Sequence, residues 1–592
     1  MMSIFETQGF LSGVDPELLA AQIRTELLET LGEPLGAARL AHLQDLANSA
    51  RKHSLGDLEI SIRLEIGWDG LDSGNTELAL SNLAWVLDYI AHHPDELDEE
   101  QRLNIATQML QVPPLAVRHP RVDASCIESL VFWMEFFASK TGIDLHSRLS
   151  SRHQVELGLG RRLAAGEALD VMSRLEEIPR QVTGEVDCPL HHFRSRIAWA
   201  VNAVDYPRAL SLYREALGRC STASWQCSHP EDIDPLLMLP QAWAGQGDVA
   251  WRAHERSYRH QSESSQYLGD IASQLRFCAA TWSLDEGLEI LHTHAHWFAN
   301  PEDPWDLLVA ARAAAALLRR ALQAYRNLDT TVPELDFAIP GNNPWFAFES
   351  LQPGVSLATA QARLERVARG LALAFDARNG NNTISVRTAA LLNQTPLCSW
   401  QSVRSLLKAH FAVAALLGEH GFHHGWAAWL LPALDEGAAA EGHVTHGSLR
   451  SDEGMALSRP VPGFSLLDFM RSHSALTRFH QAVSEVNFVS LPREISADHH
   501  WLLFETSHVA LLGLGGHWDE MLDCGLPLVD LAESLDSRRQ SLRVACYLIQ
   551  AYWQLGRLGE ARQWLIRADD FVDATTPAEL RMLLEELALL AG

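Results

Sequence analysis

Apolar residues recur three and four positions apart through most of the chain, and this spacing constrains the fold more than any other feature of the sequence. It places apolar side chains on one face of an α-helix, whereas the every-second-residue alternation of a strand is hard to find. Alanine, leucine, arginine and glutamate dominate the periodic stretches, and these residues lose little side-chain freedom in a helix. The sequence therefore predicts an all-α fold.

The length and the charge limit what such a chain can be. With 592 residues it is longer than one hydrophobic core usually serves, so we expect several units or one elongated stack. Hydrophobic residues make up 47% and charged residues 21%, the mixture of an ordered globular protein. Lys and Arg total 47 against 75 Asp and Glu, a net charge of -28. Such an acidic surface repels phosphate backbones, so we expect no nucleic acid among the partners.

Cysteine usage and the start of the chain indicate a compartment. Eight cysteines are scattered without a CxxC pair or the dense spacing of a secreted disulfide framework, which favours a reducing environment. The first ten residues carry Glu6 and no basic region of the kind that begins a signal peptide. No stretch approaches the ~20 apolar residues that span a bilayer. We therefore expect a cytoplasmic protein without a membrane partner.

Two segments share a helix, turn and helix arrangement. The clearer one runs from Leu542 to Thr575, with Gly556 in the turn and Ala561 on the second helix. The other has its turn at 205–209 and carries Ala209 at the position equivalent to Ala561. A small residue at this position lets two helix backbones approach where they cross. Gly556 tolerates the left-handed conformation that often ends a helix.

These two segments resemble tetratricopeptide repeats. Further positions equivalent to Ala209 fall at Ala168, Arg252 and Gly287, with separations of 41, 43 and 35 residues along the series. The repeat is therefore irregular and often longer than the ~34 residues usual in the family. The resemblance implies a right-handed α-solenoid of antiparallel helix pairs, similar to the divergent arrays of bacterial regulators and scaffolds.

In the tetratricopeptide family the first helices of successive repeats line a concave groove that holds a peptide or a partner helix. The lining positions, carried onto the two segments, give six candidate binding residues: His191, Arg194, Asn202, Arg543, Gln550 and Trp553. Trp199 and Trp564 lie in the same segments, where packing is the expected role and ligand contact is the alternative.

Residues 330–356 interrupt the helical pattern. Four prolines and two glycines in this stretch prevent a continuous helix from crossing it. Its aromatic residues distinguish it from a solvated linker: Phe337, Trp345, Phe346 and Phe348. The rings either fill a gap between two helical halves or contact a ligand, so Trp345 and Phe346 join the candidate binding residues.

The interruptions suggest a division of the chain. We predict an N-terminal array at 1–329, a connecting segment at 330–356 and a C-terminal array at 357–592. A second interruption at 437–464 is rich in Gly, Ser, Ala and Glu, and it predicts a mobile insertion in the C-terminal array.

Common catalytic signatures are missing from the sequence. No phosphate-binding loop, dinucleotide fingerprint, HExxH or GxSxG motif occurs, so we expect no catalytic residues and no cofactor. Glu289, His292 and His296 have the i, i+3 and i+7 spacing that could present metal ligands on one helix face, with a surface or interface cluster as the alternative. The same alternatives apply to His420, His423 and His424. Because no ligand from a second element can be identified, we predict no metal site.

Residues Gly442 to Gly447 read GHVTHG, which is similar to the His-Gly of caspase-like peptidases that bacteria fuse to tetratricopeptide arrays. Those enzymes need a nucleophilic cysteine after a strand, whereas Cys524 and Cys546 lie in helical patterns. We expect both cysteines to be core or groove residues. A Cys-His or metal-dependent hydrolase is the enzymatic alternative.

The sequence as a whole predicts a non-catalytic scaffold that binds a protein or peptide in the groove of a tetratricopeptide-like superhelix. Because the chain is acidic, we expect a partner with a basic segment and an association that weakens with added salt. The alternative is a regulatory sensor that binds a small molecule or a signal peptide inside the superhelix.

Overall fold

The computed structural model describes residues 16–591 apart from 74, 94–96, 176–188, 223–232, 263, 302, 336, 344–345, 420–475, 574–575 and 577. Over these residues the protein is all-α, as predicted, and its β-type pairings are two isolated bridges, Glu334 with Ser356 and Ile339 with Leu351. Contacts within the chain define two compact units. Unit 1 comprises Met1–Gly184, Glu302–Trp305 and Arg369–Arg387, and unit 2 comprises Glu185–Pro301, Asp306–Ala368 and Thr388–Gly592.

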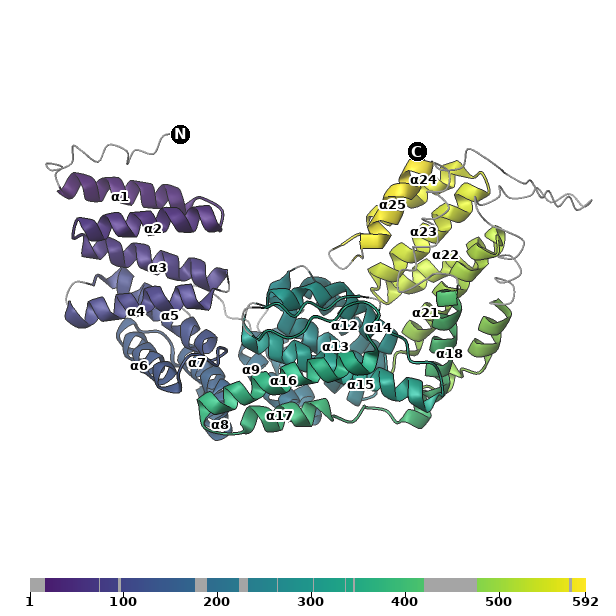
Figure 1. The fold of residues 1–592 in the computed structure, drawn as a ribbon, viewed down its shortest axis with the longest axis horizontal. Coiled ribbons are helices and arrows are strands. Elements are labelled where there is room, and N and C mark those ends of the chain that lie inside the picture. Colours follow the sequence, from purple (N-terminus) through teal and green to yellow (C-terminus); the bar gives the residue numbers. More distant parts are fainter. Residues whose placement is uncertain are drawn as a thin grey trace, which may run out of the picture. The chain divides into compact units, whose positions relative to one another are not determined.

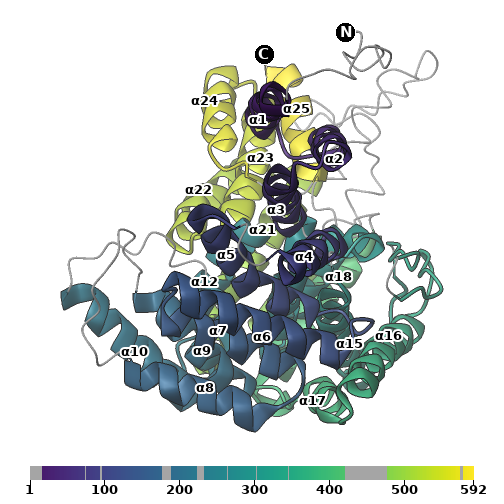
Figure 2. The same ribbon diagram turned by 90° about the vertical axis from the view of Figure 1, so that its left-hand side faces the viewer.

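In unit 1, helices that are neighbours in sequence pack against each other. Figure 2 shows this arrangement for α7 and α8. The helices of this unit are α1 (Pro16–Leu31), α2 (Ala37–Lys52), α3 (Gly56–Asp72), α4 (Thr76–His92), α5 (Glu99–Ala116), α6 (Ala124–Thr141), α7 (Leu145–Gly158) and α8 (Arg162–Leu175).

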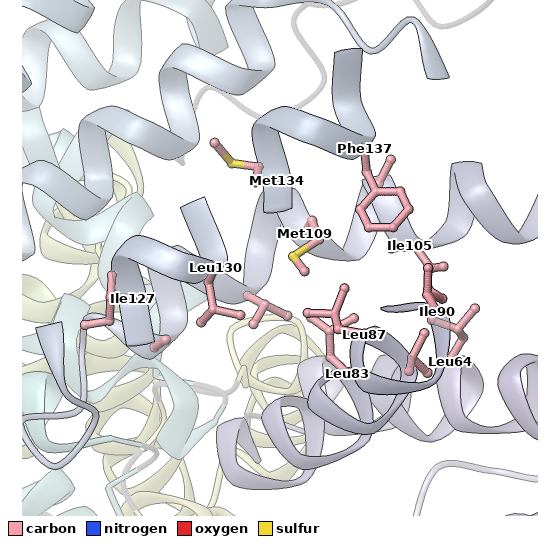
Figure 3. Packing of buried hydrophobic residues seen from close by; sticks show 14 of the residues in the cluster. Leu64, Leu83, Leu87, Ile90, Ile105, Met109, Ile127, Leu130, Met134 and Phe137 are labelled. Atoms are coloured by element: carbon pink, nitrogen blue, oxygen red, sulfur yellow. The ribbon is translucent and has the colours of Figure 1, made fainter. Parts of the chain in front are cut away.

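The larger core of unit 1 lies among α3, α4, α5, α6 and α7. Leu83 from α4, Met109 from α5, and Met134 and Phe137 from α6 converge there, each at most 3% exposed (Figure 3). Burying a side chain of this size stabilises the fold by about 1.5–3 kcal/mol. The apolar faces predicted from the sequence are thus buried between the helices of this unit.

Unit 2 contains the second series of helices (Figure 1). They are α9 (Pro189–Asn202), α10 (Tyr206–Thr222), α11 (Asp234–Trp243), α12 (Gly247–Gln261), α13 (Leu268–Thr281), α14 (Leu284–His294), α18 (Trp400–Glu419), α21 (Ala497–Leu514), α22 (Trp518–Ser534), α23 (Arg538–Gln554), α24 (Leu558–Asp569) and α25 (Ala578–Ala591), with the short helices η3 (Ser265–Tyr267), η4 (Ala295–Ala299) and η5 (Phe488–Ser490). Residues 476–484 are also helical. The helices α15 (Pro304–Asn327), α16 (Leu357–Asn379) and α17 (Thr383–Leu392) contribute residues to both units.

One turn recurs between successive helices in the described ranges. It has three residues, and the middle residue is left-handed with φ between 58° and 75° at Ser54, Gly160, Val204, Gly245, Gly516, Asp536 and Gly556. The amide that follows donates to the carbonyl five residues earlier, as from Arg557 N to Tyr552 O at 2.8 Å. This bond satisfies a carbonyl at the end of the first helix and reverses the chain. The left-handed conformation expected at Gly556 is therefore confirmed.

The turn also reveals the length of the repeating unit. The turns centred on Gly516, Asp536 and Gly556 follow one another at intervals of 20 residues, so a helix pair recurs every 40. This interval is longer than ~34 residues, as inferred from the sequence, and it is constant over these three turns.

Small residues lie where the paired helices cross. Ala209 and Ala561 are both 0% exposed, as expected for the two clearest segments. A Cβ added to Gly287 would lie 2.7 Å from Leu317 Cδ1, so this position also needs a small residue. The alignment at Arg252 was wrong. Ala209 and Ala561 each lie five residues after the left-handed turn residue, and the residue at this distance from Gly245 is Ala250, which is 0% exposed, whereas Arg252 is half-buried.

Residues 330–356 lie between α15 and α16, so no helix crosses this segment, as predicted. Phe337 is 7% exposed and stacks on His292 of α14, with ring centroids 4.7 Å apart. Phe337 thus has the packing role that we considered for the aromatic rings of this segment. Each compact unit includes residues from both sides of 330–356, so the predicted three-part division stays a prediction. The predicted insertion at 437–464 lies outside the described residues.

Candidate functional site in unit 2

Two arginines of α23 face two glutamates of α14 inside unit 2. Arg539, 3% exposed, pairs with Glu286 and, at 3.5 Å, with Glu289. Arg543, one turn further along α23, pairs with Glu289 at 2.6 Å. Residues three or four positions apart share a helix face, so the two arginines and the two glutamates present matching faces. Together they tie α14 to a helix that is distant in sequence. We call these four residues, together with Glu255, His254, His499 and His500, the buried charge cluster.

A third carboxyl group in the cluster, that of Glu255 on α12, differs from Glu286 in the direction of its pKa shift. Trp251 Nε1 and the Ser537 hydroxyl donate to Glu255 at 3.2 Å and 3.1 Å. Burial and the neighbouring Glu286 charge raise the pKa of Glu255. Burial also opposes ionisation of Glu286, but the Arg539 guanidinium outweighs it and holds the pKa of Glu286 below its usual range. The cluster therefore combines a readily ionised carboxyl, that of Glu286, with one that releases its proton less readily, that of Glu255.

Three buried histidines accompany these carboxyl groups. His254 is 0% exposed, and its Nε2 lies 3.8 Å from a carboxylate oxygen of Glu286. His499 stacks on Trp251 with ring centroids 3.4 Å apart, and neither of its ring nitrogens has a hydrogen-bond partner among the described residues. Burial lowers the pKa of His499 and of His500 well below the usual value. Both rings are therefore neutral near pH 7.

His500 connects this region to the surface of unit 2. Its Nδ1 lies 3.0 Å from His410 Nε2, and His410 Nδ1 lies 3.2 Å from the carboxylate of Asp285. The Asp285 side chain is 41% exposed and is the outer end of this chain of contacts. Because a carboxylate only accepts, His410 Nδ1 donates to Asp285, and a neutral His410 then accepts from His500.

A cavity of about 350 Å³ adjoins the buried charge cluster where α22 ends, α23 begins and α24 ends. Charged and polar residues and one aromatic ring line it: Glu533, Asp536, Ser537, Arg538, Ser541, Arg567, Asp570 and Phe571. Ser537 belongs to both features, because it lines the cavity and its hydroxyl donates to Glu255. The cluster and the cavity together form the candidate functional site.

An acidic stripe runs along the exposed face of α22. Its members follow one another at intervals of four and three residues, which places them on one side of the helix. Two of its carboxylates lie 3.8 Å and 2.6 Å from Arg567 of α24, whereas the two nearest the start of α22 have no ion-pair partner among the described residues. We call this set the α22 stripe: Asp519, Asp523, Leu526, Asp530 and Glu533.

The predicted binding residues outside α23 have different surroundings. Arg194 and Asn202 of α9 are exposed, so both are free to meet a partner. His191 belongs to the same helix, but its side chain lies outside the described residues, as does the whole of Trp345. Phe346 is half-buried, and its backbone N–H donates to the Asn343 side chain at 2.7 Å.

The predicted binding residues of α23 do not form an open face. Arg543 and Gln550 are 3% and 6% exposed, and Trp553 is half-buried. The reason is that α23 is surrounded by α21, α22, α24 and α25. Arg543 is polar because it pairs with Glu289, rather than because it faces solvent. Whether these residues contact a partner stays a prediction.

The histidine patterns do not build a metal centre among the described residues. The assumption that Glu289, His292 and His296 share one helix was wrong, because α14 ends before His296, which lies in η4. His292 stacks on Phe337 instead. No group of three or more His, Cys, Asp or Glu in the described ranges is arranged to hold a metal ion. The remaining patterns lie outside those ranges: His420, His423, His424 and the GHVTHG segment at 442–447.

The two cysteines that we weighed as nucleophiles lie on helices, as predicted. Cys524 is on α22 and Cys546 on α23. Burial raises the pKa of Cys546 to about 12, and burial with nearby carboxylates raises that of Cys524. A thiol with a raised pKa is a poor nucleophile near pH 7.

Sequence reasoning missed most of the buried charge cluster, including Glu255, Glu286, Arg539 and His499. The available signal was polar residues at positions that the helical pattern assigns to the buried face. Arg543 was selected for another reason, as a groove-lining position, and Arg539 four residues before it was not selected.

No protein-family model matches the chain, and no curated protein matches it. None of the helices in the described part has the length and apolar character needed to cross a membrane.

Proposed function

We propose that this protein is a non-catalytic scaffold that binds a partner protein or peptide through a basic segment. The α22 stripe is the contact surface in this proposal. The observation that carries it is a row of exposed carboxylates on a helix that belongs to a regular succession of helix pairs.

The recurring turn supports the scaffold part of the proposal. Helices joined by identical turns at intervals of 20 residues, from α21 to α24, are typical of helical repeat proteins. We propose that the pairs form a divergent, tetratricopeptide-like, right-handed superhelix. In such arrays the exposed helix faces form extended surfaces that bind peptides or partner helices.

Charge supports the choice of partner. Asp519 and Asp523 have no cation within ion-pair distance among the described residues, so a Lys or Arg side chain of a partner meets no competitor there. Leu526 is 38% exposed between the acidic residues and offers an apolar contact. A basic segment with an apolar residue between its charges complements this stripe.

The experiment compares three forms of the full chain as affinity baits for cell extract. The first is the wild-type protein, and the second carries Asp519→Asn, Asp523→Asn and Asp530→Asn. The third is a matched control that removes three exposed carboxylates of unit 1 instead: Glu29→Gln, Asp45→Asn and Glu99→Gln. All three forms should fold, because exposed substitutions usually change stability by at most about 0.5 kcal/mol.

We expect the wild-type and control baits to recover the same Lys- and Arg-rich partner in similar amounts. The stripe variant should recover about one tenth of that amount. Raising the salt from about 0.1 M to about 0.4 M should weaken recovery by the wild-type bait. A stripe variant that retains every partner of the wild-type bait would contradict the proposal.

A regulatory sensor is the second candidate function. The cavity next to the buried charge cluster favours it, because its volume of about 350 Å³ falls within the range of small-molecule sites. In this case the bound molecule lies at the ends of α22, α23 and α24 rather than along the α22 stripe.

A further inference from the structure

The cavity contains one unpaired charge of each sign. Three of its five charged residues have partners: Glu533 and Arg567 pair with each other at 2.6 Å, and Asp536 pairs with an arginine of α12 at 3.0 Å. The side chains of Arg538 and Asp570 are exposed and form no ion pair or hydrogen bond with the described residues. A molecule that enters the cavity therefore meets one free guanidinium and one free carboxylate.

Both unpaired side chains lie at helix ends that disfavour their charge. Arg538 is the first residue of α23, where the partial positive charge of the helix dipole repels a cation. Asp570 follows the last residue of α24, where the partial negative charge of the helix carbonyls repels an anion. Residues placed against the stability of their own helices are characteristic of functional sites.

The start of α23 also lacks its usual side-chain cap. Ser537 occupies the N-cap position, where a serine normally accepts a hydrogen bond from one of the first helix amides. It makes no such bond, and its hydroxyl donates to Glu255 in the buried charge cluster instead. The uncapped amide end of α23 therefore adds to the positive potential of Arg538 on one side of the cavity.

We propose that this cavity binds a small zwitterion, an amino-acid-like molecule with a carboxylate and an ammonium group. The carboxylate pairs with Arg538 at the start of α23, and the ammonium pairs with Asp570 at the end of α24. Phe571, 9% exposed in the lining, contacts the carbon chain between the two groups. A molecule with one charge satisfies one of the two side chains and leaves the other unpaired.

The inference gives the sensor function its ligand class and does not depend on the scaffold function. The cavity shares Glu533 with the α22 stripe, whereas Arg538 and Asp570 lie outside the stripe. Substitutions at Asp519 and Asp523 therefore test partner binding, and substitutions at Arg538 and Asp570 test ligand binding.

The test is calorimetry on the full chain with glycine, γ-aminobutyrate and ε-aminocaproate, which separate their two charges by increasing distances. Hexylamine and hexanoate serve as single-charge controls of the same chain length as the longest zwitterion. We expect at least one zwitterion to bind about ten times more tightly than either control. The same zwitterion should raise the melting temperature, because it binds the folded chain alone.

Variants assign the two charges. Arg538→Gln should weaken binding of the zwitterion about tenfold and leave hexylamine unaffected, and Asp570→Asn should weaken it equally and leave hexanoate unaffected. Arg538→Lys retains the charge and should keep most of the affinity, while the unit 1 control Glu29→Gln should leave the affinity for the zwitterion unchanged. The proposal is overturned if no zwitterion binds, if a single-charge control binds as tightly, or if Arg538→Gln and Asp570→Asn bind like the wild type.

Discussion

Replacing Arg539 with methionine should strongly destabilise unit 2, because it removes the cation that faces Glu286 at a site where both side chains are 3% exposed. Glu286 must then either stay ionised without its partner or take up a proton. For a carboxyl with the ordinary pKa of 4.5, protonation at pH 7 costs about 3.4 kcal/mol, at about 1.4 kcal/mol per pH unit. Breaking buried ion pairs in other proteins costs about 3–5 kcal/mol. We therefore expect a loss of about 3–4 kcal/mol.

Urea denaturation followed by circular dichroism measures this loss in a double-mutant cycle. Glu286→Gln alone should cost about 1–3 kcal/mol, because the cation retains Glu289 at 3.5 Å. The double variant, Arg539→Met with Glu286→Gln, should be no less stable than Arg539→Met alone, since neither charge remains unpaired. Losses that simply add, or a loss below about 1 kcal/mol for Arg539→Met, would refute the reasoning.

The pH dependence of this cycle follows from the lowered pKa of Glu286. A carboxyl with a lowered pKa in the folded state contributes stability above its unfolded pKa, and that contribution is lost as pH falls through the folded pKa. Arg539→Met removes the contribution. The difference in stability between wild type and variant should therefore be largest above pH 4.5 and narrow below it.

Three further predictions concern stability and reactivity. Burial lowers the pKa of His499 below its unfolded value of 6.5, so the free energy of unfolding should fall as pH drops below 6.5. The loss is up to about 1.4 kcal/mol per pH unit for each histidine whose pKa is lowered in this way. Equal urea midpoints at about pH 7 and about pH 5.5 would oppose this prediction. Gly556→Ala should cost about 1 kcal/mol from the left-handed backbone alone, since an added Cβ meets no atom within 4 Å. Gly559→Ala inside α24 should be neutral or stabilising. Equal urea midpoints for the two variants would contradict this prediction. Iodoacetamide should alkylate exposed Cys126 in the native protein and reach buried Cys546 only after unfolding. Mass spectrometry that finds Cys546 modified before Cys126 in the native protein would contradict this prediction.

Much of the fold could be predicted because its signals are local. Gly556 marks a turn and Ala561 marks a helix crossing, and both signals lie within a few residues of the structure they specify. The same turn also forms at Val204 and Asp536, where no glycine announces it. There the hydrogen bond to the carbonyl five residues earlier holds a side-chain-bearing residue in the left-handed region, so a search for glycine alone misses repeats.

The site was harder to predict because its residues come together from distant parts of the chain. Arg539 and Glu286 are 253 residues apart, and nothing in either local pattern identifies the other. Arg543 and Gln550 were chosen as groove residues because they are polar on a first helix. Polarity does not distinguish a solvent-facing side chain from a buried one with a partner, and both residues are buried.

The most direct measurement of the scaffold function is the dissociation constant of the complex between the purified chain and the basic segment of the recovered partner, determined at about 0.1 M and about 0.4 M salt. Our account predicts that Asp519→Asn with Asp523→Asn and Asp530→Asn weakens the complex at least about tenfold at the lower salt, while the unit 1 control variant binds like the wild type. Equal affinities for all three forms, or equal weakening by both variants, would contradict the assignment of the α22 stripe as the binding surface.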